Sequence, residues 1–202
     1  VVLGGGFLLS MIAVRSPDWW RDSLSWMGYD AASGYVFNST LIVTGMVMGA
    51  YAAVLLRLVD ADLARRLRPY LAVMALGTAC IGLFPMRVSW WSQSLHDLSA
   101  FIALTAFLGF ALMLARHSGF TRRFRGRCMA GVVGIWVMGG LYLLQIANYT
   151  FTELAILGVI AYLLSRLDRE IRLMMRAYNP PRHNTTTENT YSYQMYTEFD
   201  EQ

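Results

Sequence analysis

The sequence predicts an all-α membrane protein, a bundle of six transmembrane helices. Of its 202 residues, 56% are hydrophobic and only 15% are charged, whereas a soluble domain has about 45–50% apolar and about 25% charged residues. The apolar residues form long blocks, and the mean hydropathy is +0.41. All 17 basic residues are arginine, and they gather between the blocks. This pattern is typical of a polytopic membrane protein rather than of a large soluble core.

Six apolar segments are candidate spans, because a helix needs about 20 mostly apolar residues to cross roughly 30 Å of hydrocarbon. They are residues 1–14, 35–59, 69–86, 98–115, 128–147 and 151–167. The first is short for a span, and we expect it to be the end of a longer helix. Only "NYT" separates the last two segments, so these two helices must form an antiparallel hairpin.

Arginine placement predicts the orientation of the bundle. Arginines concentrate in residues 57–68, 116–127 and 166–182, and the other connections hold few. Short arginine-rich connections stay in the cytoplasm, so both termini are expected there, in a multi-pass protein of a bacterial inner (plasma) membrane. Five of the six tryptophans fall in the two longer connections on the opposite side, at headgroup level. Residues 16–29 predict a short interfacial helix, with Ser16 as N-cap and Pro17 at its first position.

A change of composition divides the chain in two. Residues 1–177 form the expected transmembrane domain, and residues 178–202 form a polar, tyrosine-rich and acidic cytoplasmic tail that begins near a Pro-Pro pair. Such a tail is either disordered or ordered by a partner. Its tyrosines Tyr191, Tyr193 and Tyr196 are therefore candidate contacts to another membrane protein subunit.

Polar side chains gather in one layer near the outer ends of the predicted helices. The candidates for a ligand-binding pocket there are Asn38, Arg87, His96, Asp97 and Glu153. His96 could act as a base or as a ligand of a lipid headgroup, with Asp97 or Glu153 fixing its tautomer. Arg87 could bind a phosphate or a carboxylate, and a bound phospholipid is one possible occupant.

The same residues also have a structural interpretation. Asp97 would cap the fourth helix, and Glu153 would lie in the first turn of the sixth, where the helix dipole favours a carboxylate. Adjacent helix positions point about 100° apart, so His96 and Asp97 are not expected to pair directly. We expect no metal and no cofactor, because a zinc site needs at least three ligands and the outer side offers one histidine.

Small residues are expected to serve packing. Gly45 and Gly49 form a GxxxG pattern, and residues 131–140 hold four more glycines; both patterns favour close helix contacts. Cys80 and Cys128 lie in or beside apolar segments without metal-type spacing, so we expect them to be small core residues rather than a disulfide or metal pair.

Several motifs resemble a family of six-helix bacterial membrane proteins, the domain-of-unknown-function 998 family. They are the "FN" of residues 37–38, the "GTACIGLFP" of residues 77–85, and His96 at the opening of the fourth span. The resemblance covers roughly residues 20–165 and departs where a single His followed by Asp replaces a fuller His-rich opening. The family is distantly similar to the eukaryotic Frag/DRAM/Sfk membrane proteins. It implies six helices and a membrane location, and some eukaryotic relatives imply a role with lipids.

The sequence alone favours a non-catalytic accessory or scaffold subunit of a larger membrane complex. A set of catalytic motifs is missing, and the centre of the predicted spans holds almost no polar residue, where a transporter would carry some. The alternative is an outward-facing lipid-binding or lipid-modifying protein that uses a polar pocket around His96.

Overall fold

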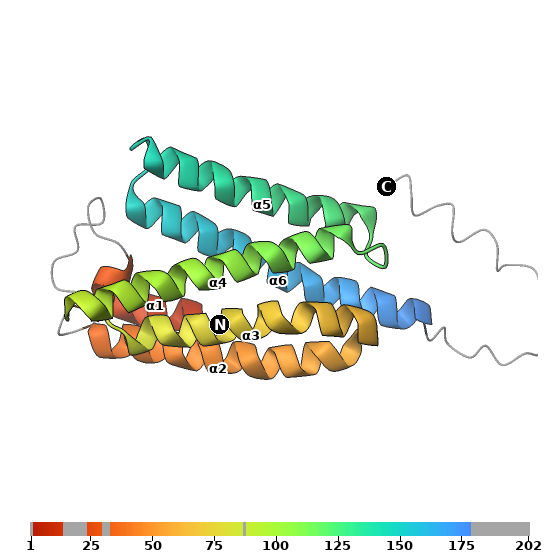
Figure 1. The fold of residues 1–202 in the computed structure, drawn as a ribbon, viewed down its shortest axis with the longest axis horizontal. Helices are drawn as coiled ribbons and strands as arrows, with labels where there is room; N and C mark the ends of the chain where they lie inside the picture. The colour runs from red at the N-terminus through yellow and green to blue at the C-terminus, as the bar shows by residue number, and fades with distance from the viewer. Residues whose placement is uncertain (1, 14–23, 30–32, 87, 179–202) are drawn as a thin grey trace, which may run out of the picture.

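The computed structural model describes residues 2–13, 24–29, 33–86 and 88–178, and these residues form helices and turns without a strand. Six α-helices and one 3-10 helix follow one another along the chain (Figure 1). They are α1 (Val2–Ala13), η1 (Leu24–Gly28), α2 (Gly34–Leu58), α3 (Ala61–Leu83), α4 (Trp90–Arg116), α5 (Arg122–Leu143) and α6 (Tyr149–Tyr178). The predicted all-α fold is thus confirmed for this part of the chain.

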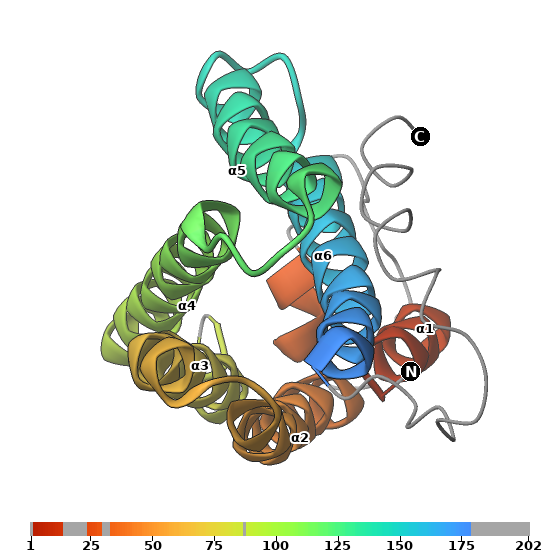
Figure 2. The same ribbon diagram turned by 90° about the vertical axis from the view of Figure 1, so that its right-hand side faces the viewer.

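Successive helices run in opposite directions along one axis. α2 packs against α1 and α3, α4 packs against α3 and α5, and α5 packs against α6. Seen down this axis, α2, α3 and α4 form one arc, α6 lies on the opposite side, and η1 lies between them (Figure 2). The predicted α5–α6 hairpin is confirmed.

Two groups of buried side chains hold the bundle together. The larger one lies toward the end of the bundle that holds the α2–α3 and α4–α5 turns. It includes Phe107, Phe110 and Phe124, each at most 2% exposed. The smaller one lies at the other end, where Leu24 and Met27 of η1 pack with Phe37 of α2. Leu24 and Met27 are 4% and 2% exposed, so η1 is a part of the core rather than a surface loop.

Two helices begin earlier than hydropathy predicts, because polar caps start them. The side chain of Asp60 accepts a hydrogen bond from the Leu63 N–H and starts α3 at Ala61, eight residues before the expected Pro69. Ser89 likewise accepts from the Ser92 N–H and starts α4 at Trp90, so the predicted boundary at residue 98 was wrong.

The last two helices also differ from their predicted limits. α5 begins at Arg122 rather than at residue 128, and α6 runs to Tyr178 rather than to residue 167. Many of the arginines that were assigned to loops therefore lie on helix ends. Residues 14–23, with the expected cap Ser16 and Pro17, lie outside the described residues, and the end of the predicted interfacial helix forms η1.

Four of the described helices are long and apolar enough to cross a membrane. They are α2, α4, α5 and residues Thr150–Leu173 of α6. α3 carries four charged side chains in its first two turns, and the described part of α1 has 12 residues. The chain is therefore a helical membrane protein, while six crossings with both termini in the cytoplasm remain a prediction.

The small residues divide into two kinds. A side chain at Gly45 would come within 2.6 Å of the Ala75 carbonyl oxygen, so this glycine lets α2 and α3 touch, as predicted. Gly134 and Gly140 of α5 have open space around them instead. Cys80 and Cys128 are both free thiols.

Candidate functional site

The polar side chains at one end of the bundle gather around η1, the turn of residues 24–28. Three helices each send one of the predicted site residues to it: Asn38 from α2, His96 from α4 and Glu153 from α6. η1 lies beside the start of α2, which it contacts directly, and between the helices in Figure 2. The sequence prediction that polar residues share one layer therefore holds for these three.

Asn38 fastens the end of η1 to α2. Its Nδ2 donates a hydrogen bond of 2.9 Å to the carbonyl oxygen of Gly28, while its Oδ1 is buried without a hydrogen-bond partner among the described residues. Nearby, the Ser33 hydroxyl donates 2.7 Å to the Met27 carbonyl oxygen. A Cβ atom on Gly34 would come within 2.7 Å of the Gly28 oxygen, so only glycine allows the chain to turn so closely into α2.

Glu153 fastens the beginning of η1 to α6. Its Oε2 accepts a hydrogen bond of 2.6 Å from the backbone N–H of Leu24. This N–H opens the 3-10 helix, where a donor has no partner within the helix itself. The carboxyl group therefore caps η1 from a helix 129 residues away in sequence.

Of the three predicted residues Asn38, His96 and Glu153, His96 is the most deeply buried, at 3% exposure. Its Nδ1 lies 3.1 Å from the Ile81 carbonyl oxygen and 2.9 Å from that of Phe84. Carbonyl oxygens only accept, so Nδ1 carries the proton and donates to both. In the neutral imidazole, Nε2 is then an acceptor, and the hydroxyl of Ser25 lies 3.0 Å from it.

The turn between α3 and α4 is braced so that both carbonyls stay in place. Ser92, 2% exposed on the first turn of α4, donates 2.8 Å to the Pro85 carbonyl oxygen. The ring of Phe84 packs edge-on against Trp91, with centroids 6.4 Å apart. The orientation of the imidazole is therefore set by carbonyl oxygens at the end of α3, next to a turn that these contacts tie to α4.

Of the other predicted site residues, the structure describes only Asp97, which does not join this group. Asp97 is exposed, one position beyond the buried His96, which agrees with the expectation that the two do not pair. Arg87 lies outside the described residues, as do Tyr191, Tyr193 and Tyr196 of the tail. The described residues contain no group of three or more His, Cys, Asp or Glu side chains placed to hold a metal ion.

Three interpretations from the sequence, two structural and one functional, were wrong in detail. Asp97 does not cap α4, because the helix begins at Trp90 behind its N-cap Ser89. Glu153 lies beyond the first turn of α6, which starts at Tyr149, and it caps η1 instead. Neither carboxylate fixes the tautomer of His96, since two backbone carbonyls do so.

Ser25 is the residue that sequence reasoning missed. It lies 71 positions before His96, in a segment that was interpreted only as an interfacial helix. A pair so far apart leaves no spacing pattern, and no motif surrounds the serine. The only available signal was a lone histidine in a layer of polar residues, which implies some partner but does not name it.

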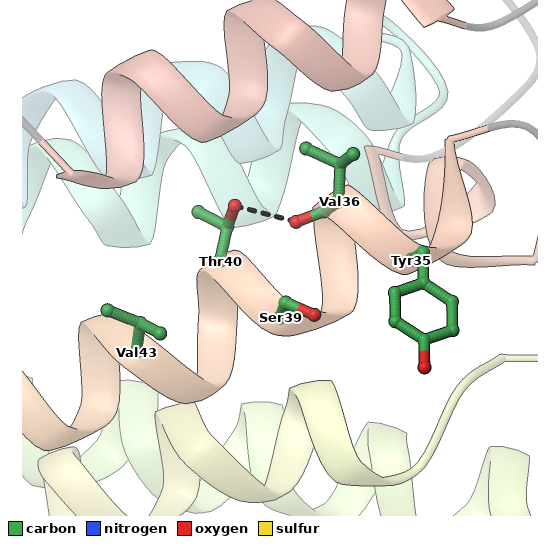
Figure 3. Close-up of a pocket in the computed structure, with 5 residues that line it drawn as sticks. All are labelled: Tyr35, Val36, Ser39, Thr40 and Val43. Carbon is green, nitrogen blue, oxygen red and sulfur yellow. Dashed lines mark hydrogen bonds between the residues drawn. The ribbon is translucent and has the colours of Figure 1, made fainter.

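A shallow groove lies on the outer face of α2 near the same end. Tyr35, Val36, Ser39, Thr40 and Val43 line it, with a volume of about 360 Å³ (Figure 3). The Thr40 hydroxyl donates 2.6 Å to the Val36 carbonyl oxygen, which leaves mainly the Ser39 and Tyr35 hydroxyls available to a ligand. The groove is thus apolar with hydroxyl groups toward the start of the helix.

A family model described as "Protein of unknown function (DUF998)" matches residues 2–166, which is most of the chain. The chain belongs to the DUF998 family. This confirms the resemblance that the sequence motifs indicated, and the match includes η1 and the three residues Asn38, His96 and Glu153. No curated protein and no solved structure matches this DUF998 protein.

Proposed function

We propose that this DUF998 protein is an outward-facing lipid-binding membrane protein whose site lies at the η1 end of the bundle. The observation that carries the proposal is the gathering of Asn38, His96 and Glu153 around one turn. Beside it, the α2 groove offers valines to an acyl chain and hydroxyls to a headgroup. Ligand sites in general combine an apolar lining with a few placed polar groups.

The proposed orientation places η1 on the outer side of the plasma membrane. The α2–α3 turn, the α4–α5 turn and the end of α6 lie together at the other end of the bundle (Figure 1), and these are the arginine-rich segments. The positive-inside rule then assigns that end, and both termini, to the cytoplasm. Six crossings follow if α1 and α3 also span.

Cysteine labelling of whole cells tests this orientation. In a Cys80→Ser, Cys128→Ser background, a single cysteine at the exposed Gln145 should react with a membrane-impermeant maleimide. A single cysteine at the exposed Ser118, in the α4–α5 turn, should react only after permeabilisation. The reverse pattern would place the arginine-rich end outside.

Native mass spectrometry of protein extracted in mild detergent tests lipid binding. The wild-type protein should retain one class of lipid, and His96→Ala should lose it. Asp97→Ala is the matched control, because this neighbour is exposed on the same helix turn, and it should retain the lipid. Equal retention by both variants would refute a site around His96, provided that His96→Ala keeps a cooperative thermal unfolding transition.

The second candidate is the non-catalytic accessory or scaffold subunit, and the exposed face of α5 favours it. Trp136 is 70% exposed within this helix, away from either end, where tryptophan is unusual because it prefers the interface. Gly139 and Gly140, about one turn further along the helix, leave open space on the same side, and small residues let a second helix approach closely. Stoichiometric protein subunits in the same detergent extract, lost on deleting residues 178–202, would establish this role. A lone chain in the extract would exclude it.

A further inference from the structure

We propose that Ser25 and His96 form a nucleophile–base pair that cleaves carboxylic esters of lipids at the η1 end of the bundle. The choice of a lipid ester as substrate rests on the lipid-binding function proposed above. The pair itself rests on geometry alone, namely the 3.0 Å between Ser25 Oγ and His96 Nε2 and the contacts that orient both side chains.

The imidazole is held in the form that a general base needs. Ile81 and Phe84 accept the Nδ1 proton through their carbonyl oxygens, at 3.1 and 2.9 Å. The Nε2 lone pair therefore faces the Ser25 hydroxyl, which donates to it. A serine becomes a nucleophile when an adjacent base takes its proton and a third group orients that base. Here two backbone carbonyls play the orienting part that a carboxylate plays in a Ser-His-Asp triad.

The serine is also held in position. The neighbouring Leu24 is 4% exposed, and the Leu24 backbone N–H donates to Glu153. Met27, two residues after Ser25, is 2% exposed in the same core cluster. Ser25 itself is only partly buried, and the proposal places the substrate against its hydroxyl. A fixed but reachable hydroxyl beside a buried base is the arrangement that nucleophilic catalysis requires.

The reaction balances with water as the only co-reactant. Ser25 Oγ attacks the ester carbonyl carbon while its proton passes to His96 Nε2. The bond between that carbon and the alkoxy oxygen breaks, and the leaving alcohol takes the proton from Nε2, which leaves an acyl group on Ser25. Water then attacks this acyl group and gives a proton to Nε2. The Ser25 oxygen leaves and takes that proton, which releases a carboxylic acid. No electron transfer is needed.

The carbonyl partners also set an expectation for the rate. Neutral carbonyls orient the ring, but they stabilise the imidazolium that forms in the transition state less than a carboxylate does. We therefore expect turnover slower than that of complete triads, and a covalent probe is a more sensitive readout than ester hydrolysis.

The test is labelling of the full chain in lipid nanodiscs with a fluorophosphonate, followed by peptide mass spectrometry. We expect an adduct on Ser25 that Ser25→Ala abolishes. His96→Asn should slow labelling by about 100-fold or more, the usual contribution of a general base. The Asn amide can still donate to the two carbonyls, so this variant removes Nε2 while keeping the structural contact. Ser94→Ala is the matched control, because that exposed serine donates to the Trp90 carbonyl oxygen instead, and it should label like wild type.

The absence of an adduct on Ser25, or labelling that His96→Asn leaves unchanged, would overturn the pair. If His96→Asn fails to fold, the wild-type labelling rate in heavy water decides, since a proton transferred to Nε2 must make it slower and an unchanged rate overturns the pair. Lipid retention is measured separately, by native mass spectrometry of the detergent extract described under the proposed function. Retained lipid with an unlabelled Ser25 refutes this inference and leaves the lipid-binding function standing. A labelled Ser25 without retained lipid supports the pair and refutes the lipid as its substrate.

Discussion

Gly82 of α3 is the position where a single methyl group should disturb the candidate site most cleanly. A Cβ atom there would come within 2.5 Å of the Asn38 carbonyl oxygen and 3.0 Å of both Leu41 Cβ and Ile42 Cγ1. Gly82 has an ordinary helical backbone, because no glycine among the described residues has a positive φ. An alanine therefore meets no conformational barrier, and its whole cost is steric.

The expected magnitude follows from two opposing effects. Alanine in a helix gains about 1 kcal/mol over glycine, whereas overpacking costs about 1–3 kcal/mol. The nearest atom is backbone and cannot swing away, so α2 must move from α3 at the point where Asn38 holds η1 and Ile81 holds His96. We expect Gly82→Ala to be destabilised by up to about 2 kcal/mol, which lowers the melting temperature by about 4–8 °C in a chain of this length.

Gly134→Ala is the matched control, because a Cβ atom there meets nothing within 4 Å. It should be neutral or stabilised by up to about 1 kcal/mol. The assay is thermal unfolding in detergent, followed by the fluorescence of the six tryptophans. A Gly82→Ala variant that melts at or above the temperature of Gly134→Ala would refute the steric conflict between α2 and α3.

Two further predictions concern the ends of helices. Gln145 has a φ of 59° in the turn after α5, a conformation that costs a non-glycine residue about 1 kcal/mol. Gln145→Gly should therefore raise the melting temperature, and a lower one would contradict the assigned turn. At the start of α3, hydrogen bonds from Arg65 and then Arg66 hold the pKa of Asp62 below its ordinary 3.8. Wild type should thus be slightly more stable than Asp62→Asn. This difference should have its full size above pH 3.8 and vanish as the pH falls through the lowered pKa. A difference that grows in acid would exclude the ion pairs.

The helices could be located from the sequence because long apolar runs leave little choice in a membrane. Their beginnings could not be located by hydropathy, since an average over many residues ignores a single cap. Asp60, Ser89 and Thr121 each accept a hydrogen bond from the backbone N–H three residues later. Each is a residue type that favours N-caps, so a search for caps beside the hydropathy profile would have placed these three boundaries.

The candidate site could be predicted only in part, for a different reason. Asn38, His96 and Glu153 were chosen because polar groups near the ends of apolar helices need partners. Their partners in η1 belong to a turn whose position the hydropathy pattern did not predict. The hydrogen bonds join residues as far apart as Leu24 and Glu153. Antiparallel helices bring their ends into one layer, but which side chains in that layer meet depends on rotation about each helix axis. Hydropathy at each position does not fix this rotation.

The two nitrogens of His96 have separable roles, and this separation decides between a purely structural histidine and a functional one. Ile81 lies in the last turn of α3 and Phe84 is its C-cap, so the Nδ1 proton satisfies carbonyls that a helix end leaves without partners. A cation or a donor at this end of a helix is favourable by itself, and an asparagine could supply the donor. Nothing in that capping role requires a second nitrogen 3.0 Å from a partly exposed serine hydroxyl. If the site only anchored η1, the bond to Ser25 would contribute about 0.5–1.5 kcal/mol, as an ordinary intramolecular hydrogen bond does, and the serine would be no more reactive than Ser94. The reactivity of Ser25, rather than the stability of the fold, is therefore the property that separates the two explanations.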